Sequence, residues 1–322
     1  MRVLITGGAG FIGSHVTERL LNRGDEVICL DNFNDYYDPR RKRRNVAPFL
    51  DRVGYTLLEG DIRSLDDLQA AFATGTIDKV LHIAAMAGVR YSIQRPELYA
   101  AVNVTGTTNV LDMACKHNVR NFVFASSSSV YGARSEAPFR ESEPVECPIS
   151  PYAATKRAAE LLTYTYHHLY GLSCTSLRFF TVYGPKGRPD MAPYLFTSRI
   201  FEGKELTMFG DGSSRRDYTY IDDMVDGIYR LMQSDTDQPA NIGCPQYVTV
   251  RQLVDAVAAA AGKAIRVRSV PGPVGVQSRN FSNGRIYGTG WRSRFDLEAG
   301  IARTYPWILK QVRKAARASG RA

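Results

Sequence analysis

The chain has 322 residues, of which 44% are hydrophobic and 23% charged, and its formal net charge is +9. This length allows a large core, either as one α/β unit or as a nucleotide-binding domain with a smaller partner. No apolar run approaches the roughly 20 residues that span a bilayer, and a predicted strand starts at residue 2, which leaves no room for a signal peptide. We therefore expect a cytoplasmic protein with no membrane partner. The five cysteines are scattered without a CxxC pair, so the sequence predicts neither a disulfide framework nor a metal site.

Basic residues gather in the run from Arg40 to Arg44 and in the tail from Lys310 to Arg321. Such an excess is compatible with nucleic acid, a membrane surface or an anionic substrate. The run has no interleaved aromatic residues and no recognition motif accompanies it, so we expect a solvated loop and tail and no nucleic-acid partner. Anionic small molecules stay plausible partners.

Short β-rich runs alternate with helical stretches from the first residue onward. Strands are predicted near 2–6, 27–31, 55–59, 79–83 and 121–125, and helices near 12–23, 64–73, 97–117 and 152–170. This alternation predicts an α/β fold with a doubly wound parallel sheet of the Rossmann type. Ligands of such sheets bind at the carboxyl ends of the strands. The residues at those ends are Gly10, Asp31, Asp61, Ala84 and Ser127.

Beyond about residue 180 the alternation gives way to Pro- and Gly-rich connections, with helices predicted near 222–233, 250–262 and 297–316. No repeat or low-complexity linker separates this part from the first. The sequence therefore predicts a nucleotide-binding Rossmann domain over residues 1–180, which includes the helix at 152–170. A smaller α/β substrate-binding domain is expected over residues 181–322, partly interleaved with the first.

Three glycines, Gly7, Gly10 and Gly13, follow the first predicted strand and open a helix. Their missing side chains permit a tight turn, the approach of a pyrophosphate to the backbone and close helix packing. Phe11 and Ile12 begin the helix whose N-terminus then faces the phosphates. A glycine triplet alone is weak evidence, because loops collect glycine in any case. Its position between a strand and a helix is what indicates a dinucleotide.

Asp31 ends the second predicted strand, where a carboxylate can accept hydrogen bonds from an adenosine ribose. The same charge would repel a 2′-phosphate, so the sequence favours NAD over NADP, with Asn32 beside it in the predicted site. The alternative is that the basic run 40–44 folds back to bind that phosphate. Asp61 and Ile62, at the end of the third strand, suit the adenine edge, although Asp61 could instead cap the next helix.

Tyr152 and Lys156 lie four residues apart in a predicted helix and so share one face. The ammonium can lower the pKa of the phenol, which makes Tyr152 a proton-transfer group. Ser127 ends the strand expected beside the nicotinamide, where it can donate a hydrogen bond to a hydroxyl that becomes a ketone. YxxxK alone occurs often by chance, and a run of serines is more often a polar loop. Together they predict a Ser-Tyr-Lys redox site.

This set of motifs resembles the extended short-chain dehydrogenase/reductase superfamily, and specifically its nucleotide-sugar epimerases and dehydratases, across nearly the whole chain. The set comprises TGGAGFIG at 6–13, Asp31, Asp61 with Ile62, Asn103, SSSSVYG at 126–132 and the YxxxK pair. The resemblance implies that Tyr152 is the base, that Lys156 holds the ribose and tunes Tyr152, and that Ser127 polarises the substrate oxygen. It makes Asn103 a structural residue near the cofactor. It also implies bound NAD and a homodimer paired through the helices near 97–117 and 152–170.

Two features select a branch of this family. Sugar 4,6-dehydratases and decarboxylating members carry an acidic residue just before Val-Tyr-Gly, where this chain has Ser128 and Ser129, so we expect no elimination of water. Three segments resemble UDP-glucuronate 4-epimerases instead: residues 31–37, residues 87–92, and residues 178–185 running into 187–191.

The C-terminal quarter departs from that pattern. Residues 271–276, 278–283, 300–305 and 307–308 resemble GDP-mannose 3,5-epimerases, which leaves the nucleotide base open. Those enzymes move protons at C3 and C5 with a cysteine and a lysine, and the corresponding residues here are Ser129 and Met191. Neither can do that work, so the sequence favours chemistry at C4.

Six residues are predicted to contact a nucleoside-diphosphate sugar. Arg216 matches the family's pyrophosphate arginine, and Arg279 is a candidate second clamp. The other four are expected to hold the carboxylate of a hexuronate: Ser128, Thr181, Arg188 and, as a further candidate, Arg90.

The predicted activity is therefore the inversion of C4 in a nucleotide sugar, with UDP-glucuronate favoured and other UDP-, GDP- or CDP-sugars open. One alternative is a sugar-nucleotide reductase or dehydrogenase that releases its cofactor. The other is a catalytically silent NAD-binding protein, which would have no need of Ser127, Tyr152 and Lys156 together.

Overall fold

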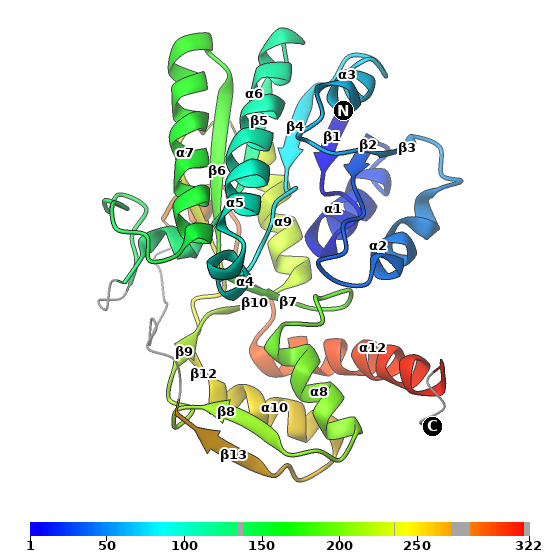
Figure 1. The fold of residues 1–322 in the computed structure, drawn as a ribbon, viewed down its shortest axis with the longest axis vertical. Coiled ribbons are helices and arrows are strands. Elements are labelled where there is room, and N and C mark those ends of the chain that lie inside the picture. Colours follow the sequence, from blue (N-terminus) through cyan, green and yellow to red (C-terminus); the bar gives the residue numbers. More distant parts are fainter. Residues whose placement is uncertain (134–137, 235, 272–283, 319–322) are drawn as a thin grey trace.

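The computed structural model describes residues 1–133, 138–234, 236–271 and 284–318 (Figure 1). Its centre is a seven-stranded sheet in the order β11-β6-β5-β4-β1-β2-β3, in which every neighbouring pair is parallel. The strands are β1 (Arg2–Thr6), β2 (Glu26–Asp31), β3 (Tyr55–Glu59), β4 (Lys79–His82), β5 (Asn121–Ser127), β6 (Ser173–Phe179) and β11 (Ala240–Ile242). The predicted doubly wound sheet is confirmed.

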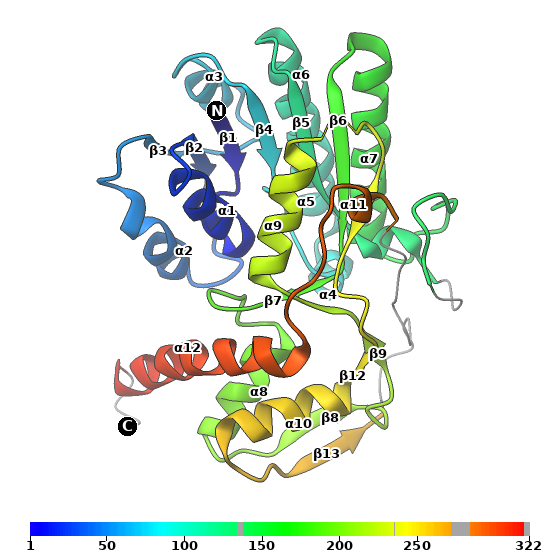
Figure 2. The same cartoon turned by 180° about the vertical axis from the view of Figure 1, so that it is seen from behind.

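Helices cover both faces of this sheet. Figure 1 shows α6 and α7 on the near face, and Figure 2 shows α1 and α9 on the opposite face. The helices of this part are α1 (Phe11–Leu21), α2 (Pro39–Val46), α3 (Leu65–Phe72), α4 (Val89–Gln94), α5 (Pro96–Ala100), α6 (Thr107–Lys116), α7 (Pro151–Tyr170) and α9 (Ile221–Met232), with short turns η1 (Ala47–Phe49), η2 (Ala101–Gly106) and η3 (Ser128–Tyr131). Because both faces are covered, the inner strand β1 carries three consecutive fully buried apolar residues, Val3, Leu4 and Ile5.

A smaller group of elements lies below the sheet in Figure 1. Its helices are α8 (Ala192–Phe201), α10 (Val250–Ala261) and α12 (Leu297–Ala318). Its strands form three two-stranded pairs: β7 (Thr181–Tyr183) with β10 (Tyr218–Tyr220), β8 (Leu206–Phe209) with β13 (Val267–Val270), and β9 (Arg215–Arg216) with β12 (Val248–Thr249). Strand β11, helix α9 and the short α11 (Gly284–Gly288) return to the large sheet. Residues on both sides of position 180 therefore build the central unit.

The helix predicted over 97–117 is confirmed as one uninterrupted helical run, but its middle is not α-helical. The π-helical turn η2 separates α5 from α6. Gly106, at the end of this turn, packs against Ile62, and a Cβ there would lie only 2.6 Å from Ile62 Cδ1. Such π-turns are frequent at functional sites, and Asn103 lies inside this one.

The basic run from Arg40 to Arg44 was expected to be a solvated loop, and that expectation is wrong. The run forms most of α2, which Asp38 caps by accepting a hydrogen bond from the backbone N–H of Arg40 at 3.0 Å, with Pro39 in the first helical position. The helix buries Lys42, which is only 6% exposed.

Within the described residues, none of the helices combines the length and apolar character that a membrane crossing requires.

Candidate active site

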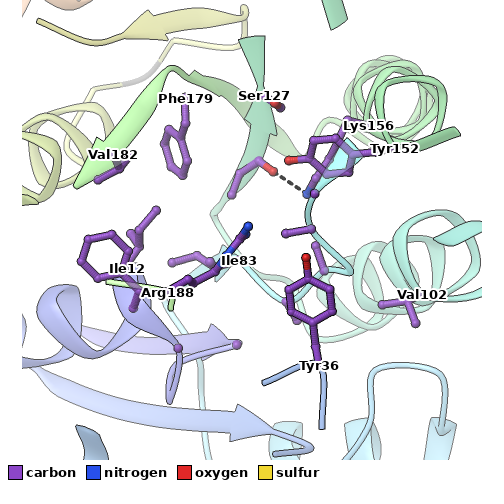
Figure 3. A pocket seen from close by; sticks show the side chains of 18 of the residues that line it. Ile12, Tyr36, Ile83, Val102, Ser127, Tyr152, Lys156, Phe179, Val182 and Arg188 are labelled. Atoms are coloured by element: carbon purple, nitrogen blue, oxygen red, sulfur yellow. Dashed lines mark hydrogen bonds between the residues drawn. The ribbon is translucent and has the colours of Figure 1, made fainter. Parts of the chain in front are cut away.

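A cavity of about 500 Å³ lies at the carboxyl ends of the parallel strands (Figure 3). It is the place where a doubly wound sheet binds its ligands. Sixteen of the predicted site residues line it: Gly7, Gly10, Phe11, Ile12, Asp31, Asn32, Asp61, Ile62, Ala84, Ser127, Ser128, Tyr152, Lys156, Thr181, Arg188 and Arg216. Gly13, Arg90 and Asn103 do not line the cavity, and Arg279 lies outside the described residues.

The glycine segment brings bare backbone to one wall of this cavity. Gly7 has a φ of +71°, and a Cβ there would lie 2.7 Å from the backbone nitrogen of Ala84. A Cβ at Gly13 would lie 2.5 Å from the carbonyl oxygen of Gly7. Any side chain would thus collide with backbone and push α1 away from the turn. The free N–H groups at the N-terminus of α1 fit the pyrophosphate of a dinucleotide.

Asp31 ends β2 and lies buried beside this turn. Its carboxylate accepts hydrogen bonds from the backbone N–H groups of Phe33, at 2.9 Å, and of Ala9, at 3.2 Å. Lys42 Nζ lies 3.4 Å from the same carboxylate, and both side chains of this ion pair are less than 10% exposed. A buried ion pair is favourable only when further hydrogen bonds satisfy it, which the two backbone groups do. Asp31 is thus held rigidly where an adenosine ribose would meet it.

Asp61 lines the cavity at the end of β3. It accepts hydrogen bonds from Asn32 Nδ2, at 2.8 Å, and from the Arg63 guanidinium, at 2.7 and 2.9 Å. The Arg63 guanidinium lowers the pKa of Asp61 to about 2, so this carboxylate is charged at neutral pH. The cap of the next helix, α3, is Ser64, which accepts a hydrogen bond from the backbone N–H of Asp67. Asp61 therefore does not serve as that cap.

Helix α7 positions the predicted catalytic pair. It begins after Ser150, whose side chain accepts a hydrogen bond from the backbone N–H of Ala153 at 3.1 Å, with Pro151 in the first helical position. This start places Tyr152 in the first turn and Lys156 one turn further along, both on the cavity wall (Figure 3).

Lys156 is almost completely buried. Its Nζ donates a hydrogen bond to the carbonyl oxygen of Ala125 at 2.8 Å, at the end of β5. Burial lowers its pKa to about 7, although the Glu160 carboxylate one turn away opposes this shift. Ser127, two residues beyond Ala125, accepts a hydrogen bond from the backbone N–H of Ser129 at 3.1 Å. The strand end and the helix thus bring the predicted Ser-Tyr-Lys set to one cavity.

Asn103 supports the site from behind the wall. It is 1% exposed, and its side chain forms hydrogen bonds with the backbone N–H and carbonyl of Met86, at 2.8 and 3.0 Å. A third hydrogen bond, at 3.1 Å, goes to Thr155 Oγ1 in α7. Asn103 therefore ties the cavity-lining segment after β4 to the helix of Tyr152. This placement explains how a residue outside the cavity can shape it.

The second half of the chain contributes to the same cavity. Thr181, Arg188 and Arg216 line the same cavity as Tyr152. Arg90 is exposed, and its guanidinium lies 5.2 Å from the centre of the Phe209 ring instead. Of the four candidates for a carboxylate grip, Ser128, Thr181 and Arg188 are the ones that reach the cavity.

The structure adds residues that sequence reasoning missed as site residues. Tyr36, Tyr37 and Lys42 line the cavity, and so does Met191. The two tyrosines fall within the segment 31–37 that already resembled UDP-glucuronate 4-epimerases, which is the signal that could have found them. Nothing in the sequence distinguishes Lys42 from its basic neighbours, because only the packing of α2 turns it inward.

The site combines a cavity at the strand ends, the glycine turn at Gly7 to Gly13 and the Tyr152–Lys156 pair. Together these features define a dinucleotide-dependent enzyme of the Rossmann class. The model of the NAD dependent epimerase/dehydratase family matches residues 3–243, and the chain belongs to this family. UDP-glucuronate 4-epimerase 4 of Arabidopsis thaliana is 50% identical over 229 residues, which are 70% of this chain and 52% of that protein. The chain thus spans about half the length of this relative.

Two further relatives match along nearly their whole length. A UDP-glucuronate 4-epimerase of Thermodesulfobacterium geofontis is 39% identical over 313 residues, 96% of each chain. The crystal structure of UDP-glucuronic acid 4-epimerase from Bacillus cereus, in complex with UDP-glucuronic acid and NAD, has a TM-score of 0.89 at 30% identity and covers 97% of this chain and 100% of that chain. The comparisons confirm the predicted resemblance to extended short-chain nucleotide-sugar epimerases, the enzyme class of NAD-dependent nucleotide-sugar 4-epimerases, and NAD as the cofactor.

Proposed function

We propose that this protein is a UDP-glucuronate 4-epimerase, which interconverts UDP-glucuronate and UDP-galacturonate with tightly bound NAD. The observation that carries the proposal is the Arg188 guanidinium, which lines the cavity of Tyr152 and Lys156 (Figure 3). A cation in that place suits a sugar that bears a carboxylate. Ser128 and Thr181, which line the same cavity, can donate hydrogen bonds to it. A cytoplasmic location, expected from the sequence, belongs to the same proposal.

In this reaction ionised Tyr152 removes the proton from the C4 hydroxyl, and Ser127 hydrogen-bonds the same oxygen. NAD held in the glycine cradle of Gly7 and Gly10 would supply the acceptor for the C4 hydride and the donor for its return. Lys156 lines the same cavity one helical turn after Tyr152, and its protonated form stabilises the phenolate; burial lowers the pKa of Lys156 to about 7. The 4-keto sugar turns within the cavity before its other face is reduced, so the reaction has no net oxidation.

A hexuronate makes an additional demand on the site. Its 4-keto form is a β-keto acid, which loses CO2 when the bond to the carboxylate aligns with the ketone π system. The site therefore has to hold the carboxylate out of that alignment. Arg188 and Thr181 are the residues we assign to this grip, with Ser128 beside them. Arg216, by its match to the family's arginine, is assigned to the pyrophosphate.

The test is turnover of the purified protein with UDP-, GDP-, CDP- and dTDP-sugars, with the C4 epimers separated and no cofactor added. We expect UDP-glucuronate to give UDP-galacturonate at the highest rate, with NAD retained by the protein. Preference for UDP-glucose would refute the hexuronate but leave a 4-epimerase. In a parallel reaction with added NAD or NADH, stoichiometric consumption of the dinucleotide would indicate a dehydrogenase or reductase. Absence of turnover with every sugar would indicate a silent binding protein.

The first prediction concerns the carboxylate grip itself. Arg188→Ala should slow epimerisation of UDP-glucuronate and raise the share of decarboxylated UDP-pentose product, because the freed carboxylate can align with the C4 ketone. The measurement is the product ratio with UDP-glucuronate, and UDP-glucose serves as the control because it has no carboxylate to release. Normal epimerisation of UDP-glucuronate by the variant would contradict the grip.

A further inference from the structure

Arg188 is held in place by a residue that the proposed reaction does not use. Its Nε donates to Asp190 Oδ1 at 3.0 Å and its Nη2 to Asp190 Oδ2 at 2.8 Å, so the carboxylate grips one edge of the guanidinium at two points. Although burial opposes the charge, this carboxylate raises the pKa of Arg188, which keeps the guanidinium protonated. The side chain of Asp190 is 45% exposed and that of Arg188 only 23%. Asp190 therefore approaches the cation from the solvent side, and it does not line the cavity that contains Arg188 and Tyr152.

A second residue supports the same pair from the other half of the molecule. Tyr36, in the segment after β2, donates a hydrogen bond to Asp190 at 3.4 Å, and the Arg188 guanidinium lies 5.6 Å from the centre of its ring. Figure 3 shows the Tyr36 hydroxyl and the Arg188 guanidinium turned into the space below Tyr152. Tyr36 thus connects the dinucleotide half of the site with the loop that carries Arg188.

Gly88 makes room for this contact. Its φ is +96°, and a Cβ there would lie 2.7 Å from the Tyr36 hydroxyl and 3.9 Å from Arg188 Nη2. A side chain at this position would displace the phenol that holds Asp190. Residues from three separate segments therefore converge on one guanidinium: Tyr36, Gly88 and Asp190.

We propose that Asp190 and Tyr36 are positioning residues that set the plane of the Arg188 guanidinium and, through it, the rotamer of the sugar carboxylate, an inference that rests on the proposed 4-epimerase function. A guanidinium is planar and offers its donors in a fixed fork. Asp190 takes the Nε edge, so the edge formed by both Nη groups is left to a substrate carboxylate, where, among the described residues, Nη2 otherwise meets only the weak acceptor Met191 Sδ at 3.9 Å. A carboxylate bound there lies in the plane that Asp190 has set, so its angle to the sugar ring is fixed as well.

The consequence concerns the fate of the 4-keto hexuronate. When the bond between C5 and the carboxylate carbon aligns with the π system of the C4 ketone, this bond can break. Its electron pair then forms an enolate with the C4 ketone. CO2 leaves, and a proton from water adds to C5, so a UDP-4-keto-pentose forms without any further oxidant or reductant. Asp190 and Tyr36 suppress this loss because they prevent the guanidinium from rotating together with the bound carboxylate.

The experiment uses UDP-glucuronate labelled in the carboxylate carbon and measures CO2 released per molecule of UDP-galacturonate formed. Asp190→Asn keeps the size of the side chain but cannot form the charged two-point grip. Tyr36→Phe keeps the ring and removes only the hydroxyl. We expect Asp190→Asn to raise the ratio by about tenfold, as the loss of one charge-assisted hydrogen bond implies, and Tyr36→Phe to raise it by less. Asp190→Glu should restore a low ratio in part.

Glu97→Gln is the matched control, because Arg95 and Glu97 form an exposed ion pair with the same two-residue spacing, at 2.6 Å, and neither lines the cavity. It should leave both rates unchanged. If Asp190→Asn loses rate but releases no additional CO2, the residue is merely structural and the inference is wrong. If the wild type does not epimerise UDP-glucuronate at all, the proposed function fails instead. The wild-type reaction thus distinguishes a failure of this inference from a failure of the proposed function.

Discussion

At the residue scale, burial decides which groups near Tyr152 can exchange protons at neutral pH. Lys156 is buried and its pKa is lowered to about 7, whereas a lysine in water keeps its proton far above that value. His82, in β4, is fully buried, and its pKa is lowered to about 3, mainly by burial and also by the charge of Lys156. It therefore stays neutral, and it forms hydrogen bonds with the hydroxyl oxygens of Thr6 and Thr107. Of these two buried bases, Lys156 is the one whose pKa lies near 7.

Replacement of Tyr152 by phenylalanine should keep the fold and bound NAD but abolish most of the epimerisation, because only the proton-transfer oxygen is removed. We expect the rate to fall by roughly 10²–10⁴. The measurements are turnover of UDP-glucuronate and the amount of NAD that copurifies with the variant. Wild-type turnover by Tyr152→Phe would show that another group is the base.

We expect the Asp31–Lys42 pair to decide between NAD and NADP. Asp31→Ala should weaken NAD binding, because the ribose acceptor is lost, and should admit NADP, because the repelling charge is lost while Lys42 is left to meet a 2′-phosphate. Dissociation constants for both dinucleotides, measured by calorimetry, test this. In the double variant with Lys42→Met the gain for NADP should disappear.

Arg40→Ala is the control for this experiment. Arg40 belongs to the same basic run, but its side chain is 83% exposed and pairs with Asp38. It should leave both affinities unchanged. Unaltered NAD affinity in Asp31→Ala would mean that Asp31 only stabilises the turn around Ala9 and Phe33.

At the scale of elements, one buried carboxylate joins α7 to the sheet behind the catalytic pair. Glu160, two turns after Tyr152, accepts hydrogen bonds from Ser126 Oγ at 2.6 Å and from Arg178 Nε and Nη2 at 2.9 and 3.0 Å. The side chains of Glu160 and Arg178 are 1% and 2% exposed. This pair fixes the helix against β5 and β6, and thereby fixes Lys156 in α7 against the end of β5.

Loss of this carboxylate should be costly. Glu160→Ala leaves the Arg178 guanidinium buried without its counter-charge, so we expect the free energy of unfolding to fall by about 3–5 kcal/mol. Arg157→Ala is the control, because Arg157 is a partly exposed partner of the same carboxylate, at 3.2 Å, and its loss should cost less than about 1 kcal/mol. Urea denaturation measures both. Equal values for the two variants would contradict the role of the buried pair.

At the scale of the whole molecule, the second half of α7 carries several exposed apolar and aromatic side chains. Leu161, Tyr164, Leu169 and Tyr170 are between 50% and 66% exposed. Large exposed apolar patches are rare on monomeric proteins. Helix α7 also belongs to the surface through which the resemblance implies pairing, so we propose a homodimer.

Light scattering at micromolar concentration should therefore give the mass of two chains. Glutamates at both Leu161 and Tyr164 should shift the protein towards the monomer, because charge would be buried in the interface. Val53→Glu is the control, since Val53 is fully exposed and lies at a distant turn before β3. A monomer mass for the unmodified protein would refute the dimer.

Local patterns determined much of this protein without any tertiary information. The alternation of strands and helices predicted the parallel sheet. This alternation can be read from the sequence because the spacing of apolar residues in each strand or helix depends only on which face of that element is buried. The glycine segment, Asp31, Ser127 and the Tyr152–Lys156 pair were found because their chemistry requires fixed spacing at strand ends or within one helix. The π-turn within the helix at 97–117 and the helix at 39–46 were not predicted, since a π-turn and a strongly basic helix have no apolar period to reveal them.

Only the tertiary structure decided which residues of distant segments meet. The inward position of Lys42, the support from Asn103 and the convergence of Tyr36, Asp190 and Arg188 depend on contacts across as many as 154 positions, as between Tyr36 and Asp190. No periodicity in a sequence encodes such pairings, because they arise when whole elements pack. The sequence by itself thus determined the fold class and indicated the groups that we propose to react, while the packing of separate segments determined which charged side chains meet in the site.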